Sequence, residues 1–147
     1  MARKRRTQAS DRFVVDSSIV LAWFFTDESD DYADAVARRS HESALIIPSL
    51  FHLEIANTLV VGERRKRCTK AQSTAFLERL AKLPFARYDE TIPHAWTETI
   101  RLARRYQLSE YDASYLELAL RISVPLASLD EPLIEAAQAA GVPLLEV

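Results

Sequence analysis

Residues 12–20 read Arg-Phe-Val-Val-Asp-Ser-Ser-Ile-Val, and this stretch decides the fold. Three apolar residues, two of them β-branched, lead directly into Asp16, and two serines precede a further apolar run. The pattern predicts a short buried strand, an acid at its carboxyl end and the start of a helix. In open α/β sheets, binding sites lie outside the carboxyl ends of the strands. The stretch therefore places Asp16 where a functional acid would lie.

Asp16 has two interpretations when it is taken alone. An aspartate at the start of a helix caps it, because the side chain accepts hydrogen bonds from free backbone N–H groups. The same position suits an acid of a binding or catalytic site. Other acids that converge on the same place would favour the second interpretation.

The alternation of strands and helices continues along the chain. We expect further strands at 44–48, 85–88, 124–129 and 142–147, and helices at 19–25, 29–41, 49–67, 69–83, 92–106, 109–122 and 131–140. Such alternation predicts a parallel sheet with helices on both faces. With 147 residues and 48% hydrophobic content, the chain fits one domain at 12–147, preceded by a basic arm at 1–11.

Composition excludes several classes of protein. One cysteine rules out a disulfide framework, and two glycines are too few for a glycine-rich phosphate loop. We find no apolar run of membrane-spanning length and no secretory leader, so we expect a cytoplasmic protein. The net charge of −2 does not indicate a general affinity for nucleic acid, although residues 3–6 and 64–67 form basic clusters. The second cluster is a candidate RNA contact or a solvated helix end.

Three further acids occupy positions comparable to that of Asp16. Glu54 lies within helix 49–67, whose apolar residues surround nearly its whole circumference and predict a buried helix. Asp112 follows Ser109 at the start of a helix, and Asp130 ends a strand before the next helix. Each has a structural alternative: a buried ion pair or an exposed position for Glu54, and helix-terminus roles for the other two. All four would nevertheless meet at one edge of a parallel sheet.

Carboxylates crowded at one edge repel one another, and a hard divalent cation removes that conflict. Mg²⁺ or Mn²⁺ prefers carboxylate oxygen, whereas the three histidines lack the spacing of zinc ligands. A magnesium site without a phosphate loop indicates hydrolysis of a phosphodiester bond.

Four segments together resemble the PIN-domain ribonucleases, in particular the VapC-type toxins of bacterial type II toxin–antitoxin systems. They are Val14–Ser18 leading into 22–24, Pro48–Asn57, Tyr111–Ala119 and Pro125–Asp130, in the family's order and spacing. The resemblance covers roughly residue 12 to the end. It implies a three-layer α/β/α sandwich with a central, mostly parallel sheet and a Mg²⁺-dependent endoribonuclease, with Mn²⁺ as a substitute.

The resemblance also implies site residues and partners. Asp16, Glu54, Asp112 and Asp130 become the acidic quartet, with Asp16 and Asp112 as the most direct metal ligands. Glu54 and Asp130 would act through water or at a second ion. The supporting hydroxyl residues are Ser17, Ser18 and Ser128. The implied partners are an RNA substrate, a cognate antitoxin protein and a second copy of the chain in a homodimer. Additional acids ranked below the quartet are Asp27, Glu28, Asp89, Glu90, Glu110 and Glu131.

Two other functions fit parts of the pattern. A magnesium-dependent phosphotransfer domain shares an acid at the sheet edge, but Ser18 stands where a second aspartate would be expected. A PIN-like module could bind RNA or a partner protein without cutting, although acids at all four positions argue against it.

Overall fold

A parallel sheet of four strands lies at the centre of the computed structural model, which describes residues 11–147. The strands are β1 (Arg12–Val15), β2 (Ala44–Pro48), β3 (Phe85–Tyr88) and β4 (Leu126–Ala127). Their order is β3-β2-β1-β4, and Val14 lies opposite Ile46 on one side and Leu126 on the other. Each of the three pairings is parallel, as the alternation of elements predicts. The predicted sheet is therefore confirmed.

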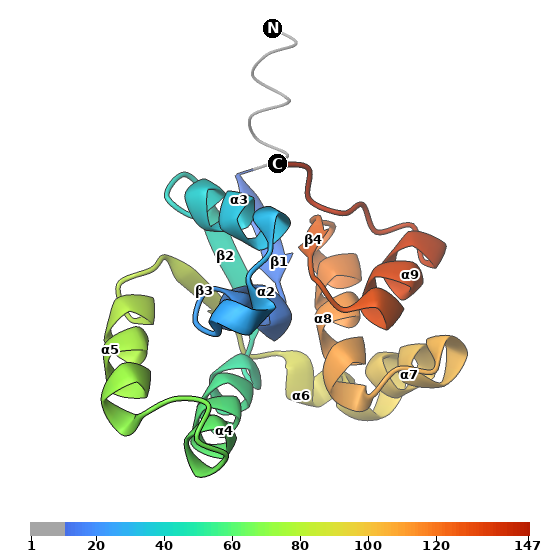
Figure 1. Cartoon of the computed structure of the whole chain (residues 1–147). Helices are drawn as coiled ribbons and strands as arrows, with labels where there is room; N and C mark the ends of the chain where they lie inside the picture. Colours follow the sequence, from blue (N-terminus) through green and yellow to red (C-terminus); the bar gives the residue numbers. More distant parts are fainter. Residues whose placement is uncertain (1–10) are drawn as a thin grey trace, which may run out of the picture.

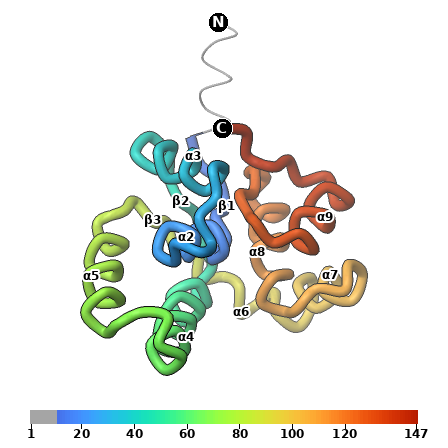
Figure 2. Tube along the Cα trace, viewed as in Figure 1, coloured from blue at the N-terminus to red at the C-terminus, as the bar shows by residue number. Residues whose placement is uncertain are grey.

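Helices cover both faces of this sheet and complete a three-layer α/β/α sandwich (Figure 1). They are α2 (Ser17–Ala22), α3 (Asp31–Arg39), α4 (Phe51–Arg64), α5 (Lys70–Leu80), α6 (Thr91–His94), α7 (Ile100–Tyr106), α8 (Glu110–Ile122) and α9 (Glu131–Ala139). A 3₁₀ turn at Thr26–Glu28 and a π-helix at Ala95–Thr99 are interposed. The trace in Figure 2 passes from the blue and green helices α2 to α5 on one side to the orange and red helices α7 to α9 on the other.

The core lies where β1 and β2 meet α8. Phe13, Val14 and Val15 are fully buried, because a central parallel strand is covered on both faces. α8 packs against β1, β2 and β4, and its residues 113–119 are all buried. This helix therefore stands in a fixed position relative to the strands.

Polar side chains cap several of the helices. Asp16 caps α2, Asp130 caps α9 by accepting a hydrogen bond from the Leu133 N–H at 3.0 Å, and Ser109 caps α8. Thr69 caps α5 in a reciprocal capping box with Gln72. The capping interpretation of Asp16 and Asp130 is thus confirmed, and it does not compete with a role in a site.

The predicted helix at 92–106 is wrong as a single element. The structure divides it into α6, the π-helix Ala95–Thr99 and α7. A π-helical turn holds an extra residue, so one 3.6-residue period cannot describe the segment, and Pro93 has no N–H to donate. As a result Trp96, expected on an amphipathic helix, is 91% exposed, while Thr99 is buried.

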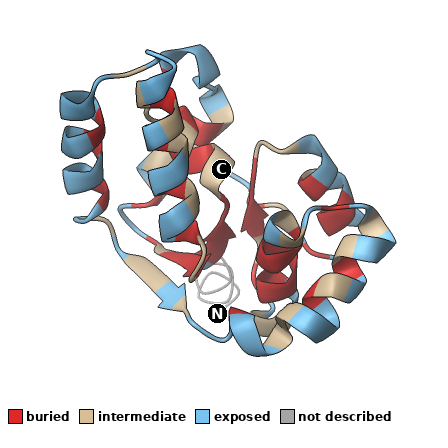
Figure 3. Ribbon diagram, turned by 90° about the horizontal axis from the view of Figure 1, so that it is seen from below, coloured by how far each residue is buried: buried red, intermediate tan, exposed pale blue. Residues whose placement is uncertain are grey.

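Helix α4 also departs from its predicted surroundings. Its buried residues form one stripe, Phe51, Ile55, Leu59 and Gly62, so the helix is not buried on all sides. Leu53 lies outside this stripe and is 76% exposed. Figure 3 shows the same division between inner and outer faces on several helices. The apolar outer face of α4 is left to solvent.

The predicted last strand at 142–147 is reduced to one bridge, between Leu126 and Leu144. The Leu145 N–H bonds to the Leu126 carbonyl at 2.9 Å, and the Leu145 carbonyl accepts a hydrogen bond from the Tyr32 hydroxyl at 2.8 Å. No helix within residues 11–147 combines the length and hydropathy needed to cross a bilayer. The basic cluster predicted at 3–6 lies outside the described residues.

Candidate active site

Four acids reach the carboxyl edge of the sheet from four different elements. Asp16 follows β1, Asp130 follows β4, and Glu54 and Asp112 lie in the first turns of α4 and α8. They interact electrostatically: the charge of Asp112 acts on Asp16 and Glu54, and the charge of Asp130 acts on Asp112. The structure therefore brings the predicted quartet together.

Asp16 is the most buried member of the quartet, with 3% of its surface exposed. Its Oδ1 atom accepts the hydrogen bond from the Ser18 N–H that caps α2, and its Oδ2 atom accepts a hydrogen bond from the Ser128 hydroxyl at 2.6 Å. Burial raises the pKa of Asp16 to about 6, because it disfavours the charged form, while the hydrogen bonds from Ser128 and Ser18 oppose this rise. The nearby charge of Asp112 adds to the rise.

Two serine hydroxyl groups join the loops that carry Asp16 and Asp130. The Ser128 hydroxyl donates to Asp16 and accepts from the Asp130 N–H at 3.0 Å. The Ser18 hydroxyl accepts from the Leu129 N–H at 2.9 Å. These bonds link the chain after β1 to the chain after β4, and they fix the direction of both acids.

Glu54 is held by a tyrosine that the sequence analysis did not single out. The buried Tyr115 hydroxyl donates to Glu54 Oε1, and the Ser17 side chain lies within hydrogen-bond reach of the same tyrosine. Burial and the charges of Asp16 and Asp112 raise the pKa of Glu54 to about 7, against the opposing effect of the Tyr115 hydrogen bond. Tyr115 lies three residues after Asp112, and this spacing places both on one face of α8. That spacing is the signal that could have identified it.

Asp112 is half-buried at the start of α8. Burial, followed by the charge of Asp130, raises its pKa, and a hydrogen bond involving Ser109 opposes the rise. Asp130 accepts its capping bond through Oδ2. Across residues 11–147, none of the four acids forms an ion pair with a lysine, arginine or histidine. The quartet therefore has no counter-charge from the described part of the chain.

Most of the lower-ranked acids do have such partners. Asp27 and Glu28 both pair with Arg67, at 3.1 and 3.7 Å, and the Arg67 guanidinium also lies over the Phe25 ring. Asp89 pairs with Arg87, and Glu90 pairs with Arg121. These contacts distinguish the quartet from its acidic neighbours, and they give Arg67 a structural role within the 64–67 cluster.

The donor chemistry of the quartet fits a hard divalent cation. Carboxylate oxygens are the ligands that Mg²⁺ and Mn²⁺ prefer. Burial is the main cause of the three raised pKa values and charge repulsion adds to it, and a bound cation would favour the ionised forms against both effects. In the described residues, no three acidic, histidine or cysteine side chains lie close enough to form a complete metal site by themselves. Mg²⁺ usually keeps several waters and binds protein through one or two carboxylates. Asp16 and Asp112, whose charges interact, are the pair predicted from the sequence for that role.

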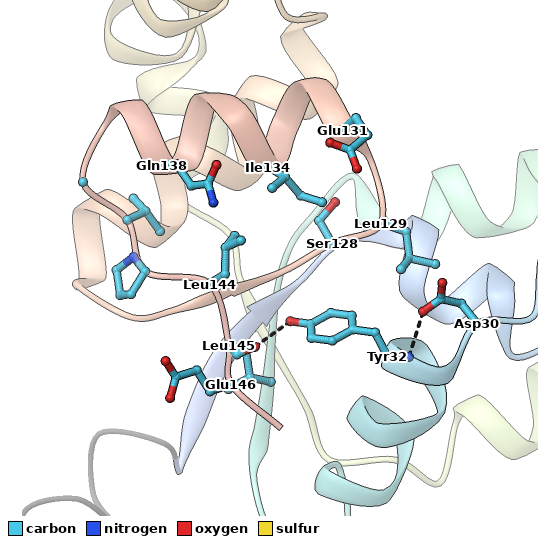
Figure 4. Close-up of a pocket in the computed structure, with 13 residues that line it drawn as sticks. Asp30, Tyr32, Ser128, Leu129, Glu131, Ile134, Gln138, Leu144, Leu145 and Glu146 are labelled. Atoms are coloured by element: carbon cyan, nitrogen blue, oxygen red, sulfur yellow. Dashed lines mark hydrogen bonds between the residues drawn. The ribbon is translucent and has the colours of Figure 1, made fainter.

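One large pocket does not lie at the quartet. It measures about 820 Å³ and lies between α9, the segment 142–146 and Tyr32, as Figure 4 shows. Ser128 lines it, but none of the four acids does. A second pocket of about 380 Å³ includes Glu54 in its wall. We place the candidate site at the quartet, because chemistry and not pocket size identifies it.

Comparison with known proteins identifies the family of the chain. The model of the family described as PIN domain matches residues 13–139. The protein named Ribonuclease VapC3 from Pyrobaculum aerophilum is 27% identical over 124 residues, which cover 84% of this chain and 93% of that protein. Ribonuclease VapC3 from Mycobacterium tuberculosis is 29% identical over 136 residues, 91% of this chain and 93% of that protein.

Among solved structures, the crystal structure of PAE2754 from Pyrobaculum aerophilum is similar to this chain. It superposes with a TM-score of 0.66 and 23% sequence identity, covering 92% of this chain and 85% of the other. This similarity supports the fold.

Proposed function

The chain belongs to the PIN-domain family, and on this premise we propose that it is a metal-dependent endoribonuclease and the toxin of a type II toxin–antitoxin pair. The observation that carries the proposal is the quartet itself: four electrostatically coupled acids without a basic partner in the described chain. The names of the similar VapC3 ribonucleases support RNA as the substrate.

Asp16 and Asp112 would hold Mg²⁺ or Mn²⁺ directly, and Glu54 and Asp130 would act through water. The chemistry that such an ion supplies is polarisation of a phosphate oxygen and activation of water for in-line attack. Glu54 would orient that water and accept its proton, because its carboxylate lies beside the proposed metal ligands Asp16 and Asp112. Tyr115 holds Glu54 in place, and Ser128 holds Asp16.

The proposal includes partners and location. A cognate antitoxin would inhibit the nuclease, the protein would form a homodimer, and it would act in the cytoplasm. These statements rest on the similarity to VapC ribonucleases.

The test is a cleavage assay with the full chain, purified free of any antitoxin. We expect structured RNAs to be cleaved with Mg²⁺ or Mn²⁺ and to stay intact with a chelator. Asp16→Asn should abolish cleavage, whereas Asp34→Asn should not, since Asp34 is exposed on α3 outside the quartet. RNA binding without cleavage in either metal would overturn the proposal in favour of a non-catalytic binding module.

A further inference from the structure

The pocket beside Glu54 opens between α4 and the start of α8. It measures about 380 Å³, and its walls are formed by Leu50, Leu53, Glu54, Asn57, Thr58 and Tyr111. Glu54 belongs to both the pocket and the acidic quartet, and Tyr111 directly precedes Asp112. A substrate held at the quartet could therefore extend into this pocket.

The walls leave an aromatic and an apolar side chain uncovered. Tyr111 is 64% exposed and Leu53 is 76% exposed, although both side chains are large and apolar. Isolated exposed apolar residues are common, but an aromatic and a leucine that line one pocket beside a candidate active site form a binding surface. The outward-facing half of α4, which sequence periodicity assigned to the core, supplies this surface.

The remaining wall residues are polar without being charged. Asn57 offers an amide with both hydrogen-bond donors and an acceptor, and Thr58 offers a hydroxyl. Glu54 is the one ionisable carboxylate in the wall, and no lysine or arginine lines the described pocket. A phosphate group would find no positive charge here, whereas a flat, uncharged, hydrogen-bonding group would be well accommodated.

We infer that this pocket receives the nucleobase adjoining the scissile phosphate, with the Tyr111 ring as its stacking surface and the Asn57 amide contacting its edge. The inference rests on the proposed ribonuclease function. Sequence-selective proteins bind unpaired RNA bases by stacking them on aromatic side chains and bonding their edges. The volume lies near the lower limit of the roughly 300–1,000 Å³ typical of ligand pockets, which suits a single base.

A protein segment is the other occupant that such walls could accept. The nucleobase is favoured because the pocket shares Glu54 with the acids that would act on the phosphate. The nucleobase in the pocket and the phosphate at the quartet would then belong to the same RNA substrate, and the adjoining pocket and quartet would hold both.

The first experiment compares RNA oligonucleotides that carry an abasic ribonucleotide on either side of the cleaved bond. With the wild-type chain, the abasic substitution on the side that faces the pocket should lower kcat/KM about 5- to 150-fold, the scale of base stacking on an aromatic ring. Tyr111→Ala should lower cleavage of the intact RNA by a similar factor and should abolish the penalty of the abasic site. Tyr111→Phe should retain the wild-type behaviour. Equal abasic penalties in wild type and Tyr111→Ala would overturn the inference.

The second experiment measures base stacking without cleavage. An RNA with 2-aminopurine at the same position should lose fluorescence when it binds the wild-type chain and Tyr111→Phe, but not Tyr111→Ala. Trp96→Ala is the matched control, because Trp96 is an exposed aromatic residue outside the pocket. Quenching without cleavage would overturn the ribonuclease proposal but support the base-binding pocket. Cleavage without quenching would support the ribonuclease proposal but overturn the base-binding pocket. If Tyr111→Ala instead weakened only self-association or binding of a protein partner, the pocket would be a protein interface and the inference would be wrong.

Discussion

Two of the three acids in helix α8, Asp112 and Glu117, lie in opposite surroundings. Glu117 is 3% exposed, and the Arg121 guanidinium donates to both of its carboxylate oxygens, at 2.7 and 3.1 Å. Arg121 also reaches Glu90 at 3.2 Å. Asp112, at the start of the same helix, forms no ion pair with the described residues and instead faces the negative charges of the quartet.

The contrast distinguishes a structural acid, which is paired with a cation of the chain, from acids that would need a bound cation to balance their charge. A buried carboxylate is costly unless it is paired, and the chain supplies the partner for Glu117 itself. At the quartet the chain supplies further acids and neutral hydrogen-bond donors. Raising the pKa of Asp16 from 3.8 to about 6 corresponds to about 3 kcal/mol of unfavourable interaction with the charged form. A bound cation would offset that cost.

The largest expected effect is on catalysis, and it distinguishes Asp112 from Glu117. Asp112→Asn should lower kcat/KM for RNA cleavage by at least about 10²-fold, the scale for losing one electrostatic group at a reacting centre. Glu117→Gln should keep most of the cleavage rate per folded molecule while lowering stability. A cleavage assay paired with thermal denaturation of both variants checks this. Comparable losses of cleavage in the two variants would contradict the assignment of Asp112 to the active site and of Glu117 to the fold.

The second effect is on stability at the Glu117 end of the helix. Arg121→Met should reduce the free energy of unfolding by about 3 kcal/mol, because it leaves a buried carboxylate without its cation. Arg101→Met should change it by less than about 1 kcal/mol, since the Arg101–Glu98 pair is exposed. Urea denaturation followed by circular dichroism measures both. Similar losses of stability in both variants would mean that burial does not determine how much the Glu117–Arg121 ion pair contributes to the free energy of unfolding.

The third effect concerns pH, measured with a chelator present. The folded-state pKa of Asp16, about 6, lies above its ordinary value of 3.8, so the folded protein binds more protons than the unfolded chain between about pH 4 and 6. The contribution of the Asp16 carboxyl to the free energy of unfolding is therefore fully present below about pH 4 and is lost as the pH rises through 6. Asp16→Asn removes the titration and keeps a capping oxygen.

The stability of Asp16→Asn relative to the wild type should accordingly rise with pH, by up to about 3 kcal/mol between pH 4 and 7. Matched urea denaturation series at the two pH values measure the difference. A difference that does not change with pH would show that burial does not shift the titration of Asp16.

The sequence predicted the quartet because each acid lies at a strand end or a helix start, and parallel topology brings those ends to one edge. The capping roles of Asp16 and Asp130 followed from the same local pattern. The bond between Tyr115 and Glu54 joins residues 61 positions apart on two helices, so local periodicity could not reveal it. The exposure of Leu53 was missed for a related reason, because which faces of α4 are covered depends on where the other helices pack.

The smallest expected effect is on the pKa of Asp16, which depends on its hydrogen bond with Ser128. The hydrogen bond from the Ser128 hydroxyl favours the ionised form of Asp16, so Ser128→Ala should raise the pKa of Asp16. The titration profile of the Asp16 carboxyl, followed by NMR in the metal-free chain, should move upward by about one pH unit, the scale of one hydrogen bond to a charged group. Ser40→Ala is the control, because Ser40 is also buried but bonds to the Ala37 carbonyl in α3. An unchanged profile in Ser128→Ala would contradict this role.

The most direct test of the quartet as a cation site is calorimetric titration of the full chain with Mn²⁺. We predict that the wild-type chain binds Mn²⁺, that Asp16→Asn and Asp112→Asn weaken the affinity by at least about tenfold, and that Glu117→Gln leaves it unchanged. Equal affinities in the wild type and the two quartet variants, or a loss confined to Glu117→Gln, would contradict the account.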